Sequence, residues 1–86
     1  MKTLPKDITG RICKGIRAFL NWDQRDLSGN SEVGLSTIRN LENNKVEAHP
    51  NPSTILSIAT AFEESGVTVE HNEDKEEVIV TYKYGN

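Results

Sequence analysis

The side chains best suited to recognition chemistry lie within one short stretch of the chain. Arg39 can bond a guanine edge or a phosphate, and Asn40 can bond adenine through two parallel hydrogen bonds. The short hydroxyl groups of Ser36 and Thr37 can reach base edges or phosphates, and Leu35 can meet a thymine methyl group. Each is an ordinary surface residue when taken alone. Together they predict readout of base edges, provided that one helix presents them on the same side.

The spacing of apolar residues from position 24 to position 42 predicts such a helix. Leu27 and Val33 can point inward on either side of a turn-prone run, and Ile38 and Leu41 follow three residues apart on one face. This pattern predicts two short helices, at about residues 24–30 and 35–43, joined by a tight turn. The second helix then leaves Leu35, Ser36, Arg39 and Asn40 on its outer side, as a helix in the DNA major groove requires.

This segment resembles the helix-turn-helix of the phage repressor/Cro family, the Xre-type transcriptional regulators. The family pattern is Gln-x-x-Leu-Ala-x-x-x-Gly-Val-Ser-x-x-x-Ile-x-x-Leu/Ile-Glu, and the resemblance extends over about residues 8–66. The matching positions here are Gln24, Leu27, Val33, Ile38, Leu41 and Glu42.

Three positions depart from the family pattern. Ser28 stands where Ala is usual, a small-for-small change. Glu32 replaces the turn Gly, so either a non-Gly residue takes a positive φ or the turn is reshaped. Gly34 replaces Ser or Thr at the start of the second helix, where Gly is a weaker N-cap.

The resemblance also implies roles for residues outside the reading helix. Gln24 would hold a phosphate at the start of its helix, with an exposed helix starter as the alternative. Asn43, Asn44 and Lys45 resemble the family's phosphate-binding loop, with solvated loop residues as the alternative. Arg17 and Glu42 occupy positions that form an ion pair in related repressors, which would orient the reading helix rather than touch bases.

The charge distribution refines the expectation of a nucleic-acid partner. A net charge of −3 opposes DNA binding at first sight. Residues 1–45, however, hold eight Lys/Arg and five Asp/Glu, whereas residues 46–86 hold two Lys/Arg and eight Asp/Glu. We therefore expect the acidic half to face away from DNA. Because the basic half is only modestly positive, affinity is expected to rely on dimerisation.

Residue types that support catalysis or metal binding are sparse. Cys13 is the only cysteine, so it can form no intrachain disulfide, and its neighbours Ile12 and Ile16 predict a buried, inert thiol. His49 and His71 are far apart, in a predicted loop and a predicted strand. Nothing has metal-ligand spacing or pairs a nucleophile with a base. We expect no enzymatic activity, no cofactor and no metal.

The remaining pattern predicts two further helices. A first helix at about residues 9–20 repeats Ile8, Ile12, Ile16 and Leu20 every four residues, with Phe19 widening the stripe. Asn21 is expected to end that helix in a left-handed conformation, and Trp22 is expected to pack inward. Asp23 is expected to cap the next helix, which has Asp26 in its first turn. Residues 43–52 read as a loop. A last helix is expected to start at Ser53 or Thr54 and to stop at Gly66.

The C-terminal segment changes to a period of two. Val67 and Val69 alternate with Thr68 and Glu70. After the polar run 72–76, a second period-two segment sets Val78, Val80, Tyr82 and Tyr84 against Ile79, Thr81 and Lys83. This alternation predicts a β-hairpin, which would pack on the first and last helices or pair its edge with a second copy. The predicted fold is mainly α, with a four-helix repressor-like helix-turn-helix domain at residues 1–66 and a hairpin extension at 67–86.

At 86 residues the chain has room for one small core. No apolar run approaches the roughly 20 residues of a membrane span, and the N-terminus lacks the apolar core of a signal peptide, so a cytoplasmic protein is expected. The predicted function is transcriptional regulation through double-stranded DNA. A repressor would bind a palindromic operator as a homodimer, with half-sites roughly 34 Å apart. Two alternatives stay open: an antitoxin that represses its own operon and holds a toxin with its hairpin, and a protein-interaction module that uses the acidic half.

Overall fold

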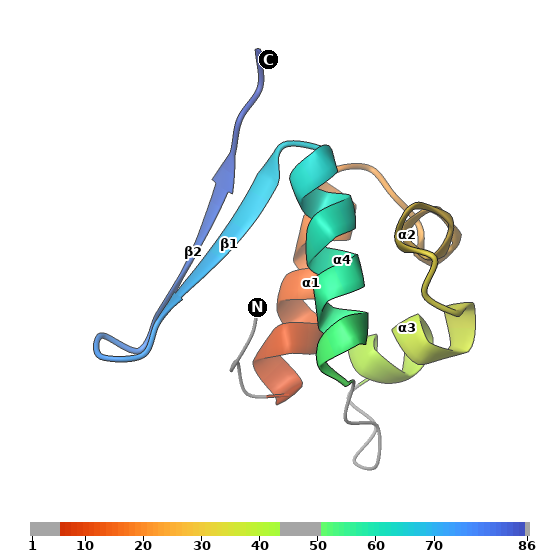
Figure 1. Ribbon diagram of the computed structural model, residues 1–86, viewed down its shortest axis with the longest axis horizontal. Helices are drawn as coiled ribbons and strands as arrows, with labels where there is room; N and C mark the ends of the chain where they lie inside the picture. Colours follow the sequence, from red (N-terminus) through yellow and green to blue (C-terminus); the bar gives the residue numbers. More distant parts are fainter. Residues whose placement is uncertain (1–5, 44–50, 86) are drawn as a thin grey trace.

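The computed structural model describes residues 6–43 and 51–85. Four helices precede a two-stranded antiparallel sheet, which is the fold class that the sequence predicts (Figure 1). The elements are α1 (Lys6–Phe19), α2 (Gln24–Ser31), α3 (Leu35–Glu42), α4 (Pro52–Glu64), β1 (Val67–Asn72) and β2 (Glu77–Tyr82).

The starts of two helices differ from the prediction. α1 begins at Lys6, three residues earlier than expected. α4 begins at Pro52 rather than at Ser53 or Thr54, because Asn51 is the N-cap: its side chain accepts a hydrogen bond of 2.8 Å from the Thr54 backbone N–H. Proline suits the first turn of a helix, where its missing N–H would have no intrahelical partner. The predicted loop at residues 43–52 lies largely outside the described residues, as do His49 and Lys45.

The junction between α1 and α2 follows the prediction closely. Asn21 ends the first helix with a φ of 60°. Asp23 and Asp26 form a capping box: the Asp26 N–H donates to Asp23 at 2.7 Å, and the Asp23 N–H donates to Asp26 at 2.9 Å. These bonds satisfy backbone donors that the first turn of α2 would otherwise leave unpaired.

The core lies where the four helices and the first strand meet, and Trp22 packs at its edge against Phe62. Phe19 departs from the predicted helical stripe. It is 61% exposed, and its ring meets Tyr82 of β2 edge-on with the centroids 4.9 Å apart. The apolar side of α1 therefore packs against the hairpin as well as against the helical core. The buried hydrophobic residues are Cys13, Ile16, Leu27, Ile38, Leu41, Ile58, Ala61, Phe62 and Val67.

The hairpin packs on the helices through its first strand. Val67 is 1% exposed, and β1 lies against α4. Gly66 makes the change of direction between them with a φ of 93°, and its carbonyl accepts a 2.8 Å hydrogen bond from the Lys83 N–H. Packing of the hairpin on the first and last helices, one of the two predicted arrangements, is thus present in the monomer.

Gly10 and Gly15 in α1 provide a matched test of the packing between α1 and α3. A Cβ atom at Gly10 would collide with the backbone carbonyl of Leu41, whereas a Cβ at Gly15 would meet nothing within 4 Å. We expect Gly10→Ala to lower the free energy of unfolding by about 1–3 kcal/mol. Gly15→Ala should instead raise it by up to about 1 kcal/mol, because Ala is the better helix former. Urea denaturation measures both; equal stabilisation by the two changes would contradict this packing.

Candidate nucleic-acid interface

The turn between α2 and α3 is held by serine hydroxyl groups rather than by glycine. Glu32 takes the left-handed conformation, with a φ of 62°, and its N–H donates to the Ser28 carbonyl at 2.9 Å. The Ser28 hydroxyl donates to the Val33 carbonyl at 2.6 Å, and the Val33 N–H donates to the Ser31 hydroxyl at 3.2 Å. A non-Gly residue therefore adopts the positive φ, and Ser28, the departure from Ala, ties the turn to α2.

α3 has one buried side and one exposed side. Ile38 and Leu41 are 0% and 1% exposed, and they fix the inner side against the core. The spacing of residues 36, 39, 40 and 43 places those four on the opposite side of the helix. The exposed residues of α3 and its C-cap are Ser36, Thr37, Arg39, Asn40 and Asn43.

Most of the predicted DNA-contacting residues are thereby brought together. Leu35 lies half-buried at the start of α3, next to the exposed stripe. Among the described residues, the Arg39 guanidinium makes no hydrogen bond or ion pair, so it is available to a partner. Asn43 is the C-cap of the helix, and its N–H donates to the Arg39 carbonyl at 2.9 Å. Lys45 lies outside the described residues.

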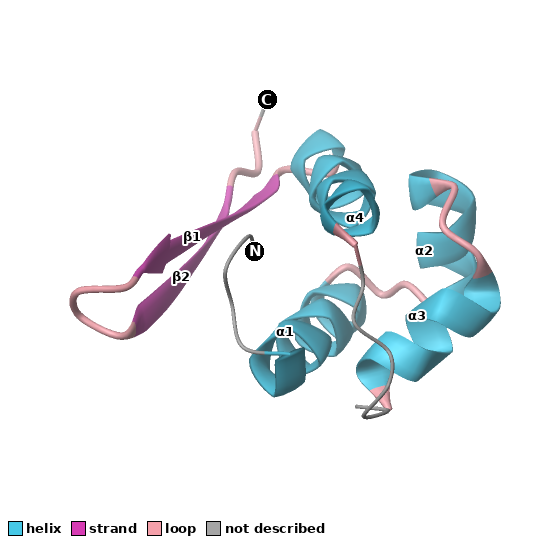
Figure 2. Cartoon of the chain, turned by 60° about the horizontal axis from the view of Figure 1, so that its bottom comes forward, coloured by secondary structure: helices cyan, strands magenta, loops and turns pink. Residues whose placement is uncertain are grey.

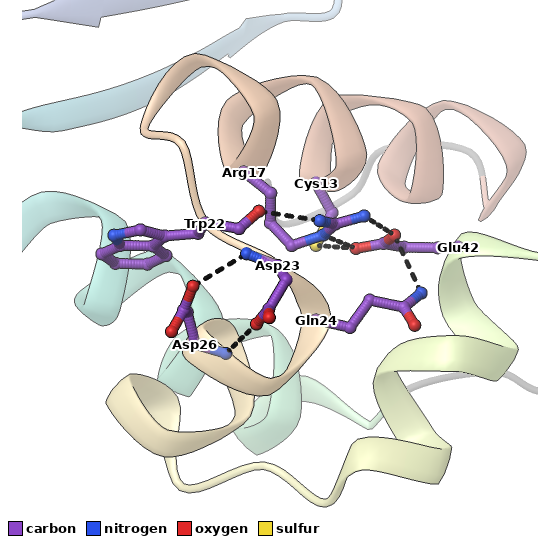
Figure 3. Close-up of polar contacts among 7 residues, drawn as sticks. All are labelled: Cys13, Arg17, Trp22, Asp23, Gln24, Asp26 and Glu42. Carbon is purple, nitrogen blue, oxygen red and sulfur yellow. Dashed lines mark hydrogen bonds and ion pairs between the residues drawn. The ribbon is translucent and has the colours of Figure 1, made fainter.

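The ion pair between Arg17 and Glu42 is present, and it joins α1 to the last residue of α3 (Figure 3). Arg17 Nε and Nη2 each lie 2.7 Å from a different oxygen of Glu42, so the pair is bidentate. The third nitrogen, Nη1, donates to the Trp22 carbonyl at 2.9 Å. The side chains are 13% and 2% exposed, respectively, and the contact is therefore largely removed from solvent.

Two further residues join this pair, and the sequence reasoning did not anticipate them. Gln24 Nε2 donates to Glu42 Oε1 at 3.2 Å, and Cys13 Sγ lies 3.5 Å from Glu42 Oε2 (Figure 3). The spacing offered one signal, because residues 13 and 17 lie four apart on the same face of a helix. An amide has two donors, so Gln24 keeps one for another partner, and its phosphate contact stays a prediction.

The cluster shifts the proton affinities of its members. Burial raises the pKa of Glu42, but hydrogen bonds from Arg17 and Gln24, together with the positive charge of Arg17, outweigh burial and hold the pKa below its ordinary value. For Cys13, burial and then the charge of Glu42 raise the pKa of the thiol well above its ordinary value. The thiol therefore stays neutral, in keeping with the predicted inert role.

The exposed side of α3 and the acidic residues of the hairpin lie far apart. Figure 2 shows the hairpin and α3 on opposite sides of the pair formed by α1 and α4. Residues 70–77, which include the hairpin turn, hold five Asp/Glu and one Lys. A polyanion lying along α3 would thus meet Arg39 without approaching the most acidic part of the molecule.

No protein-family model matches the chain, and no curated protein matches it. Within residues 6–43 and 51–85, no helix is long and apolar enough to cross a membrane.

Replacing Arg17 tests how much the ion pair contributes to the free energy of unfolding. Arg17→Met keeps most of the side-chain stem but leaves the Glu42 carboxylate without its charged partner. Because the Glu42 side chain is almost fully buried, we expect the free energy of unfolding to fall by about 3 kcal/mol. Arg11→Met, which removes an exposed guanidinium from the same helix, should change it by less than about 0.5 kcal/mol. Urea denaturation distinguishes the two; similar small losses would show that the pair is energetically minor.

The lowered pKa of Glu42 predicts a specific acid sensitivity. Because the folded state binds this proton less readily than the unfolded state, the stabilisation is fully present above the ordinary glutamate pKa of 4.5 and is lost as pH falls through the folded-state pKa. We expect Glu42→Gln to lose this part of the acid dependence when unfolding is followed from about pH 7 to about pH 3. The control Glu63→Gln changes an exposed carboxylate of α4 and should keep the wild-type slope. A wild-type slope in Glu42→Gln would refute the assignment.

Proposed function

We propose that this protein binds double-stranded DNA in a sequence-specific manner through the exposed side of α3, and that it regulates transcription in the cytoplasm. The observation that carries the proposal is the position of Arg39 and Asn40 side by side on an exposed helix whose opposite side is fixed in the core. These side chains suit the donor and acceptor pattern of guanine and adenine in the major groove.

The dimensions of α3 favour insertion into that groove. An α-helix with its side chains is about 10–12 Å across, and the major groove is about 12 Å wide, so a single helix such as α3 can lie in it. Ser36 and Thr37 lie in its first turn, where backbone N–H groups without intrahelical partners favour contact with phosphate. Gly34 at the N-cap makes no side-chain hydrogen bond that would satisfy them.

The resemblance to phage repressor/Cro-type regulators supports a repressor rather than an enzyme. Such a protein would occupy an operator and exclude polymerase from it. The paired residues Arg17 and Glu42 would then fix the orientation of α3. Because residues 1–45 carry only a modest positive charge, one copy alone would bind DNA weakly, and useful affinity would require two copies on a palindromic site.

Selection of bound sequences from a random duplex library at low salt tests the proposal. We expect enrichment of a palindromic site and retention that falls as salt is raised, because phosphate contacts release counterions. Arg39→Ala should weaken binding to the selected site by about 1–3 kcal/mol and relax the preference at one base position.

Lys75→Ala is the matched control, because it also removes one exposed positive charge but lies in the hairpin turn, away from α3 (Figure 1). It should leave the affinity and the preference unchanged. A loss in Arg39→Ala that is equal on all sequences would reassign the residue to the phosphate backbone. Absence of any salt-dependent retention of duplex DNA would overturn the proposed function.

A further inference from the structure

The second strand of the hairpin presents an apolar surface that the monomer covers only in part. Val67 and Val69 of β1 share the inner face of the sheet with Val80 and Tyr82 of β2, and Val67 is buried beneath the helices. Val80 and Tyr82, directly opposite Val69 and Val67, are still 49% and 43% exposed. The helices thus cover the first strand and leave the second strand accessible.

This exposed face continues into an apolar groove along α1. The groove holds about 350 Å³, and its walls include Ile12, Gly15 and Phe19 from α1 and Val80 and Tyr82 from β2. Tyr84 extends the surface: it is 81% exposed and stacks on Tyr82 with ring centroids 6.2 Å apart. Contiguous exposed apolar surface of this kind marks an interaction site in a small protein.

The edge of β2 that faces away from β1 also carries unpaired backbone N–H and C=O groups. Among the described residues, β2 pairs with β1 alone. Because the Lys83 N–H bonds to the Gly66 carbonyl, the odd-numbered residues of β2 direct their backbone groups toward β1. The free N–H and C=O groups therefore belong to Val78, Val80 and Tyr82. An unpaired edge of this length is a template for a further strand.

We propose that the occupant of this edge is a second copy of the same chain, joined antiparallel along β2 with Val80 opposite Val80 of the copy. Opposed residues of an antiparallel pair point to the same face of the sheet. Any register that continues the apolar inner face must therefore pair even-numbered residues with even-numbered ones. The two-fold axis must then pass at a residue, and the three positions nearest the middle of the segment from Glu77 to Lys83 are Ile79, Val80 and Thr81.

Charge selects among these three registers. With Val80 on the axis, Glu77 of each copy stands opposite Lys83 of the other, so two pairs of opposite charge form at the ends of the joined strands. With Ile79 on the axis, Lys83 meets Lys75, and with Thr81 on the axis, Glu77 meets Gly85. Only the Val80 register opposes unlike charges, and it also lets Val78, Val80 and Tyr82 each exchange two backbone hydrogen bonds with the copy.

This inference rests on the proposed function in one respect, since it assigns the surface through which a DNA-binding homodimer would form. α3 lies across the molecule from β2, so the joined strands leave its exposed side free (Figure 2). The four-stranded sheet would also relieve the weakness of a two-stranded hairpin, which is marginal in water without further packing.

Sedimentation equilibrium of the full chain without DNA, over a concentration series, tests the inference separately from DNA binding. We expect a monomer–dimer equilibrium. Lys83→Glu and Glu77→Lys, each of which places two like-charged pairs in the interface, should each raise the dimer dissociation constant roughly tenfold. The double variant exchanges the two charges and should restore the wild-type constant, which a general loss of folding would not allow.

Leu56→Glu is the control for the other exposed apolar face, because Leu56 is 67% exposed on α4. It should leave the dissociation constant unchanged. A monomer at every concentration, single variants that associate as the wild type does, or dissociation caused by Leu56→Glu would each overturn the β2 interface. If the charge exchange behaves as expected but no duplex is retained, the DNA proposal fails while this interface stands.

Discussion

The carboxylate of Glu42 determines how α3 is held. It is the last residue of α3, and it accepts hydrogen bonds from Arg17 of α1 and Gln24 at the start of α2. A negative charge at the C-terminus of a helix opposes the helix dipole, and Arg17 compensates for it at close range. An eight-residue helix is too short to be stable alone, so its orientation depends on these contacts and on the burial of Ile38 and Leu41.

The two ends of α3 are fixed by different means. At its start, the hydroxyl groups of Ser28 and Ser31 hold the turn, and at its end the ion pair is reinforced by the close approach of Gly10 to the Leu41 backbone. An apolar replacement of a buried ion pair can be as stable, but it carries no directional bonds. The bidentate geometry therefore contributes to fixing the rotation of the helix, which decides which side chains face outward.

The local sequence pattern was sufficient to predict the helices that surround the candidate interface. The capping box at Asp23, the left-handed Asn21 and the spacing of Ile38 and Leu41 depend on neighbours in sequence, and each was predictable. The participation of Gln24 in the ion-pair cluster was not, because it depends on how distant segments meet. For the same reason Phe19 could not be assigned to the hairpin side of α1. Contacts with bases or phosphates depend on a partner molecule, and the sequence of one chain does not specify that partner's geometry.

The hairpin shows how one set of residues can both prevent and permit association. An exposed apolar edge strand is an aggregation hazard, which charged residues at its ends reduce. Glu77, the first residue of β2, and Lys83, directly after its last residue, carry opposite charges, so a strand without the complementary pattern would leave at least one of them unpaired or repelled. An antiparallel copy of the same strand, paired as proposed, would satisfy both charges at once. In the proposed dimer, the charges that protect the edge from other chains would therefore favour its own copy, because the two-fold symmetry of the pairing places each charge opposite its counterpart.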